Sequence, residues 1–189
     1  MKVGYCVEGS NDKWLLHGLR DRWCAGVELI QGKFRGAFKR REIPNACLEL
    51  HSKGVDVIVL LRDANDENWR DVEKDDREAC KTEHVHLIVV GVCDRNVESW
   101  LTADKQYAAE ETNLPITEFQ VEDAKTVFNR AMGITRLDDQ KDKLISYVVR
   151  APLRNWLVNR SFEEFYDQLR VKSNELKCLL EDLRQTRQV

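Results

Sequence analysis

The segment VDVIVLLRDAND, residues 55–66, decides the fold of this chain. Its first seven residues are almost all apolar and mostly β-branched, which is typical of a strand buried on both faces of a parallel sheet. Polar residues begin abruptly at Arg62, and Asp63 and Asp66 follow at once. We therefore predict a strand over residues 55–61 with an acidic turn at its carboxyl end.

Strand-like and helix-like segments alternate along the chain on both sides of this segment, and the further strands extend the predicted sheet. Three further apolar runs have the length and composition of strands: residues 2–7, 27–30 and 86–92. Between the four strands, apolar residues recur at helical spacing over residues 11–24. We also predict a helix over residues 43–51, which Gly54 ends, and a charged helix over residues 67–82. The order predicts an α/β fold with a four-stranded, mainly parallel sheet flanked by helices.

Strand-like runs stop after about residue 105, and only helical patterns follow, over residues 121–132, 138–151 and 162–187. We predict an α/β core over residues 1–105. Residues 106–189 then form a helical extension that packs on the same domain.

Composition narrows the class of protein. The chain has 189 residues, of which 42% are hydrophobic and 33% charged, so it can bury a core and needs a large solvated surface. Its net charge of −3 excludes a chain that is basic throughout. No apolar run approaches the roughly 18 residues of a membrane span, and no signal peptide is visible, which favours a cytoplasmic protein with no membrane contact. The six cysteines form no CxxC pair and are predicted to be reduced, mostly buried thiols.

Acidic side chains follow three of the predicted strands. Glu8 ends the first strand, Asp63 and Asp66 follow the third, and Glu98 lies one helical turn beyond the end of the fourth. Open α/β sheets bind ligands at this edge, and Mg²⁺ or Mn²⁺ takes oxygen ligands of this kind. Each residue also has a simpler interpretation as a turn former, a helix cap or a partner of the helix dipole.

Three segments, in this order, resemble the Toprim domain of topoisomerases, primases and OLD-family nucleases. They are VEGSND at residues 7–12, LLRDAND at residues 60–66 and ESWLTAD at residues 98–104. The third is similar to a segment of small stand-alone Toprim-like proteins that are encoded beside ABC-type ATPases. The resemblance covers roughly residues 1–105 and implies a Toprim-like Rossmannoid fold for this part of the chain.

The resemblance implies a catalytic role for Glu8 and Asp63, with Glu8 as a general acid/base or metal ligand. The predicted Mg²⁺ or Mn²⁺ ligands are Glu8, Asp63, Asn65, Asp66 and Glu98. One position departs from the family, because Asn65 stands where the second metal-binding aspartate is expected. An amide still offers a carbonyl oxygen but no charge, so Asp66 can take the role, or the site can be weak or inactive.

A glycine-containing loop at residues 31–41 interleaves cations with Phe34 and Phe38. Its basic residues are the predicted nucleic-acid contacts, to DNA or RNA: Lys33, Arg35, Lys39, Arg40 and Arg41. Cations between aromatic rings suit contact with a phosphate backbone and with bases. The alternative is a solvated loop whose phenylalanines fill the core. No lysine is placed near the acidic residues by its spacing in the sequence.

Three functions remain open at this stage. The first is a metal-dependent nuclease that acts in an antiphage or toxin-like system with an ABC- or SMC-like ATPase partner. The second is a non-catalytic Toprim-like subunit that binds a partner ATPase or nucleic acid. The third is a phosphotransferase with Asp63 as nucleophile, although no glycine-rich phosphate loop supports it. The sequence leaves the oligomeric state open, so an oligomer is compatible with it.

Overall fold

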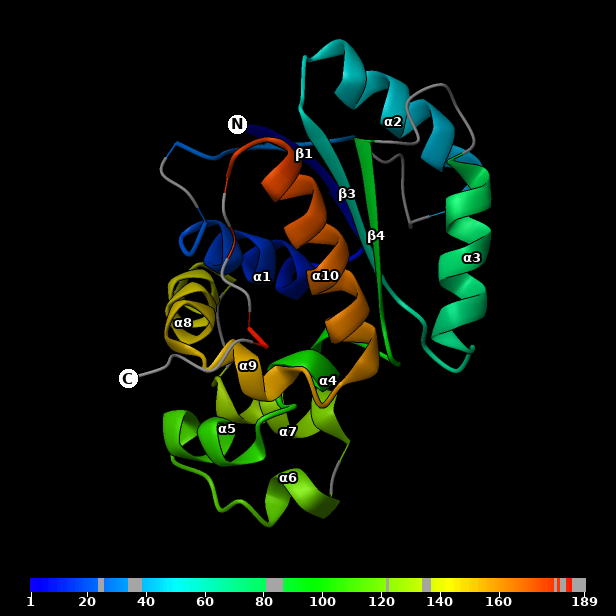
Figure 1. Ribbon diagram of the computed structural model, residues 1–189. Helices are drawn as coiled ribbons and strands as arrows, with labels where there is room; N and C mark the ends of the chain where they lie inside the picture. Colours follow the sequence, from blue (N-terminus) through cyan, green and yellow to red (C-terminus); the bar gives the residue numbers. More distant parts are fainter. Residues whose placement is uncertain are drawn as a thin grey trace.

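The computed structural model describes the chain except for residues 24–25, 34–38, 81–86, 122, 134–136, 179, 181–182 and 185–189. Four strands form one sheet: β1 (Lys2–Val7), β2 (Glu28–Gln31), β3 (Val57–Asp63) and β4 (Ile88–Cys93). Their order is β2-β1-β3-β4 and every pairing is parallel, which confirms the predicted α/β fold class. The sheet and its flanking helices are shown in Figure 1.

Strand β3 is buried as predicted but is displaced along the chain. It begins at Val57 and continues to Asp63, where it pairs with Cys93 of β4. The prediction of residues 55–61 was therefore shifted by two residues. Asp63 belongs to the strand itself, so its side chain is held by the sheet rather than by a turn.

Helices cover both faces of the sheet, as continuous burial of its strands requires. One face carries α2 (Ile43–Ser52) and α3 (Trp69–Ala79). The other carries α1 (Ser10–Arg20), α8 (Leu137–Arg150) and α10 (Arg160–Glu175), and Figure 1 shows both layers.

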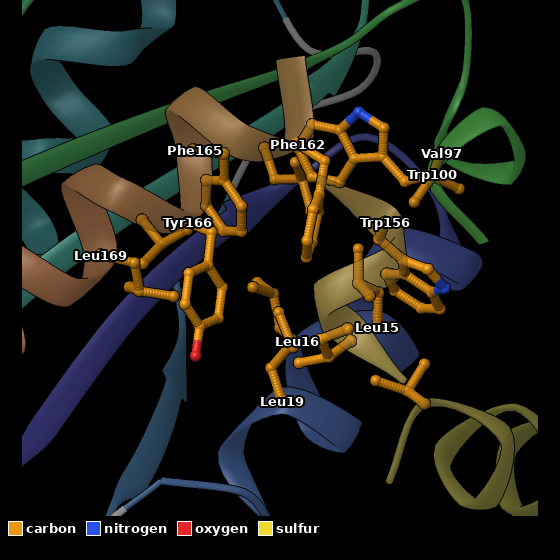
Figure 2. Packing of buried hydrophobic residues seen from close by; sticks show 14 of the residues in the cluster. Leu15, Leu16, Leu19, Val97, Trp100, Trp156, Phe162, Phe165, Tyr166 and Leu169 are labelled. Carbon is orange, nitrogen blue, oxygen red and sulfur yellow. The ribbon is translucent and has the colours of Figure 1, made fainter. Parts of the chain in front are cut away.

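Aromatic residues fill the core on the α10 side. Trp100, Trp156, Phe162 and Phe165 lie together there, as Figure 2 shows, and the Trp100 and Phe165 rings stack with centroids 5.2 Å apart. Gly91 of β4 lets the Phe165 ring lie directly against the strand, because a Cβ atom at position 91 would lie 2.6 Å from Phe165. Helices α8 and α10 thus share one core with the sheet, whereas Ala108, Ala109, Phe119 and Val127 form a small cluster of their own.

Six short helical segments complete the described chain. They are the 3₁₀ helix η1 (Arg40–Glu42), α4 (Val97–Leu101), α5 (Lys105–Thr112), α6 (Glu118–Val121), α7 (Ala124–Ala131) and α9 (Leu153–Trp156). The helix predicted over residues 121–132 divides into α6 and α7. Asp123 separates them, because its carboxylate accepts the Thr126 N–H and caps α7.

The last helix is shorter than predicted, and the prediction of residues 162–187 was wrong. After Glu175 the chain turns at Lys177, whose φ of 60° is left-handed. The Cys178 N–H bonds to the Ser173 carbonyl and the Lys177 N–H to that of Asn174, the pattern of a Schellman cap. The chain then folds back, and Cys178 enters the core.

The cysteine prediction holds for four residues and fails for one. Cys6, Cys47, Cys80 and Cys93 are free and buried. Cys178 is disulfide-bonded, which the spacing of the cysteines did not predict. Within the described part of the chain, no helix is both long enough and apolar enough to cross a membrane.

Candidate metal centre

The candidate site lies where the connections of the sheet change direction. From β1 the chain passes through α1 to β2 on one side, and from β3 it passes through α3 to β4 on the other. The two helices lie on opposite faces of the sheet (Figure 1). The carboxyl ends of β1 and β3 therefore frame a topological switch point, the usual ligand position in open α/β sheets.

Glu8 and Asp63 meet at this switch point. Glu8 directly follows β1 and is exposed, and its Oε2 accepts the Asp63 N–H at 3.4 Å. Asp63 is half-buried, and its Oδ1 accepts the N–H of Val97, the first residue of α4, at 3.0 Å. The end of β3 is thus linked both to β1 and to the short helix after β4.

Helix α4 brings Glu98 to the same place. Its side chain is 2% exposed, and its Oε1 accepts the Asn11 side-chain N–H at 2.7 Å. A glutamate that only complements a helix dipole would stay in solvent, so the burial needs another explanation. Helix α10 supports this region, because Ser161 Oγ accepts both the Trp100 indole N–H at 2.6 Å and the Asp94 N–H at 3.1 Å.

Asp12 is a site residue that the sequence reasoning did not name. It lies in the first turn of α1 and is 2% exposed, and its Oδ2 accepts the Gly9 N–H at 2.8 Å. Its Oδ1 is buried without a hydrogen-bond partner among the described residues. Ligand atoms of Asp12, Asp63 and Cys93 all lie within 4.8 Å of one another. The sequence feature that could have identified Asp12 is its position in the first turn of a helix that begins at the carboxyl end of a strand.

The carboxylates of this group repel one another. Burial raises the pKa of Asp63 to about 6, and the charges of Glu98 and Glu8 add to the effect. The pKa of Asp12 lies well above its usual value, first because of burial and then because of Asp63. Among the described residues, Lys125 of α7 is the cation that opposes the rise at Asp63. No sequence pattern pointed to Lys125, because the packing of α7 against α4 brings it here.

These residues fit a hard divalent cation. Asp12 and Asp63 bring carboxylate oxygens within 4.8 Å of each other, and Oδ1 of Asp12 has no hydrogen-bond partner among the described residues. Glu98 and Glu8 are outside that group, but their charges act on Asp63. The Cys93 thiol is fully buried, and burial raises its pKa well above the usual value, so it stays protonated beside the cluster. A protonated thiol is a poor ligand, so the donor set consists of oxygen atoms and suits Mg²⁺ or Mn²⁺.

Two predicted ligands lie at the rim rather than in the cluster. Asn65 and Asp66 are exposed on the turn after β3, and in the described part of the chain no hydrogen bond or ion pair joins their side chains to the carboxylates. Asn65 has a left-handed φ of 54°, which asparagine tolerates well, and its N–H bonds to the Arg95 carbonyl at 2.7 Å. The backbone conformation of the turn accounts for an asparagine here.

The predicted basic segment is only partly described, because Arg35, Phe34 and Phe38 lie outside the described residues. Lys33, Lys39 and Arg41 are exposed. Arg40 instead pairs with Asp75 at 2.8 Å and with the buried Asp76 at 3.5 Å. Both aspartates belong to α3, which lies on the face of the sheet opposite α1. The described end of the segment therefore packs away from Asp12.

The raised pKa of Asp63 predicts how metal and pH act together. Because its folded-state pKa of about 6 exceeds the usual value of 3.8, this carboxyl stabilises the fold below pH 3.8 and loses that contribution as pH rises through 6. A cation binds the deprotonated group, so its stabilising effect grows over the same range. We expect the increase in Tm caused by Mn²⁺ to be larger at pH 7.5 than at pH 5, measured by differential scanning fluorimetry. An equal increase at both pH values would contradict metal binding at Asp63.

Comparisons of the chain with protein-family models, with curated proteins and with solved structures found no match.

Proposed function

We propose that this protein is a divalent-metal-dependent nuclease that hydrolyses phosphodiester bonds at the carboxylate cluster. One observation carries the proposal: the carboxylates of Asp12 and Asp63 lie within 4.8 Å of each other at the switch point, near the buried Glu98, and one oxygen of Asp12 has no hydrogen-bond partner among the described residues. Such a group is costly unless a cation neutralises it. The order of the Toprim-like motifs supports phosphodiester chemistry rather than another metal-dependent reaction.

The residues divide into those that hold charge and those that handle protons. Asp12, Asp63 and Glu98 would hold the cation, which when bound supplies positive charge to a phosphate group in transfer. Glu8 is the exposed member, so it is the group placed to take a proton from an attacking water. Lys125 is also exposed, and its charge lowers the pKa of Asp63, so it is the cation that would attract a phosphate oxygen.

A cleavage assay tests the proposal directly. We expect the wild-type protein to cut labelled DNA or RNA with Mg²⁺ or Mn²⁺ and to lose this activity in EDTA. The Glu8→Ala variant should be slower by about 10²-fold or more, because it lacks the general base. Glu28→Ala is a matched control, because Glu28 is an exposed glutamate at the start of β2, at the opposite edge of the sheet. Full cleavage by Glu8→Ala would refute the assignment.

The position of Asn65 favours a second candidate, a Toprim-like subunit that binds but does not cut. This candidate predicts stable binding of a partner and no metal-dependent cleavage. The Asn65→Asp variant separates the two, because aspartate also tolerates a left-handed φ and adds a charge at the rim of the site. We expect Asn65→Asp to cleave at least as fast as the wild type if the site is active but weak. If neither the wild type nor Asn65→Asp cleaved nucleic acid, the result would favour the non-catalytic subunit.

We also propose a partner protein for this activity. The ESWLTAD segment, residues 98–104, supports a partnership with an ABC- or SMC-like ATPase in an antiphage or toxin-like system. Within this segment Asp104 is structural, because its carboxylate caps α5 and accepts the Asn155 side-chain N–H at 2.7 Å. Co-purification with an ATPase encoded beside its gene is the measurement that checks this partnership.

A further inference from the structure

A second cluster lies beside the carboxylates at the same edge of the sheet. We call Lys13, Trp14, His17 and Lys141 the cation–indole cluster. Lys13 follows Asp12 in the first turns of α1, and its Nζ donates to Gln31 Oε1 at 3.1 Å. Gln31 is the last residue of β2, which borders β1. The cluster is therefore at the β2 side of the sheet edge that holds the carboxylates.

Two lysines of the cluster are held against one indole ring. Lys13 Nζ lies 4.7 Å from the centroid of the Trp14 ring, and Lys141 Nζ of α8 lies 5.5 Å from it. The close packing of α1 on α8 brings them together, because Gly18 leaves room for Val148. A cation is attracted to the face of an indole, so the Trp14 ring helps to hold both ammonium groups within 5.5 Å of its centroid.

Two ammonium groups make the cluster positive. Neither Lys13 nor Lys141 forms an ion pair with a described carboxylate. His17 packs edge-on against Trp14 with centroids 5.4 Å apart. The pKa of His17 is lowered by burial and then by Arg20 and the two lysines, so the ring is neutral at pH 7. Two ammonium groups at one indole ring, neither of them paired with a described carboxylate, suit an anion from outside the chain.

We propose that the cation–indole cluster binds the phosphate backbone of a nucleic-acid strand next to the bond that is cut. This inference rests on the proposed nuclease function and names the surface that holds its substrate. The carboxylates repel a phosphodiester, whereas the two lysines attract the phosphates that flank it. A strand along the carboxyl edge would cross from the lysines at the β2 end to the carboxylates at the β1 and β3 ends. An acidic protein surface is the competing ligand.

The test compares two double variants that lose the same charge. Lys13→Gln/Lys141→Gln removes the cluster, and Lys74→Gln/Lys177→Gln removes two exposed lysines on α3 and after α10. Binding of a labelled single-stranded oligonucleotide is measured by fluorescence anisotropy in EDTA at several salt concentrations. We expect Kd to rise about tenfold for the cluster variant, and the slope of log Kd against log salt to fall by about 1.4. The control should match the wild type.

A second measurement does not depend on a variant. Bound oligonucleotide should protect Lys13 and Lys141, but not Lys74, from acylation as read by mass spectrometry. Equal affinity of both double variants, or no protection of the two lysines, would overturn the inference even if the protein cleaves. A wild type that binds an acidic protein but no oligonucleotide would overturn it in favour of the competing ligand. A wild type that binds through the cluster yet never cleaves would refute the nuclease and leave the subsite standing.

Discussion

Replacing Asp63 by asparagine is expected to lower the rate of metal-dependent cleavage by about 10³-fold and to leave the fold intact. The loss follows because a charged ligand at the centre of the cluster becomes neutral, and the charge that a bound metal supplies is worth several kcal/mol in the transition state. The fold survives because the asparagine Oδ1 still accepts the Val97 N–H and because the change removes one of several repelling charges.

A matched control for this variant lies at the same edge of the sheet. Asp94 directly follows β4 and is exposed, so Asp94→Asn removes one carboxylate close to the site without touching the cluster. Its cleavage rate should stay within about twofold of the wild type, as is usual for an exposed substitution. Cleavage by Asp63→Asn at a rate similar to that of Asp94→Asn would contradict the assigned role. Single-turnover cleavage kinetics are the appropriate measurement.

Replacing Asp12 by asparagine should stabilise the metal-free protein at pH 8. The asparagine keeps an acceptor for the Gly9 N–H but carries no charge into a site where burial and Asp63 disfavour one. We expect a gain of roughly 1–3 kcal/mol, or about 2–12 °C in Tm, because an uncompensated buried charge is removed. In the same variant, stabilisation by Mn²⁺ should largely disappear. Thermal melts with and without Mn²⁺ measure both effects.

The pH dependence of this gain serves as its control. Because the folded-state pKa of Asp12 is raised, the protonated carboxyl stabilises the wild type at low pH, and this contribution is lost as pH rises through that pKa. Wild type and Asp12→Asn should therefore be closer in stability at pH 5 than at pH 8. A variant that is less stable than the wild type at pH 8 would show that Asp12 serves the fold rather than a cation. Such a trade of stability for function is common at active sites.

The sheet and part of the site could be predicted from local patterns. The apolar run of β3 and the abrupt change to polar residues determine where that strand ends, so Asp63 had to lie at the carboxyl edge. The same reasoning applies to Glu8 after β1. Parallel pairing then brings the two residues together, as the contact between Glu8 Oε2 and the Asp63 N–H shows.

Other features depend on contacts between segments that are distant in the sequence. Asp12 resembles an ordinary first-turn residue of a helix, and it becomes a buried carboxylate only because α1 docks beside α4. Lys125 reaches Asp63 only through the packing of α7 on α4. The end of α10 was missed because Lys177 adopts a left-handed conformation for which lysine has no preference. Local periodicity contains none of this information.

A titration with Mn²⁺, followed by calorimetry at pH 7.5, tests the central claim most directly. The wild type and Asp94→Asn should bind saturably, and Asp63→Asn should bind at least about 10²-fold more weakly because it lacks a charged ligand. At pH 6, binding to the wild type should also release protons, because Asp63 is partly protonated there. If Asp63→Asn bound Mn²⁺ as tightly as the wild type, or if the wild type showed no saturable binding, the carboxylates at the switch point would not form a metal site.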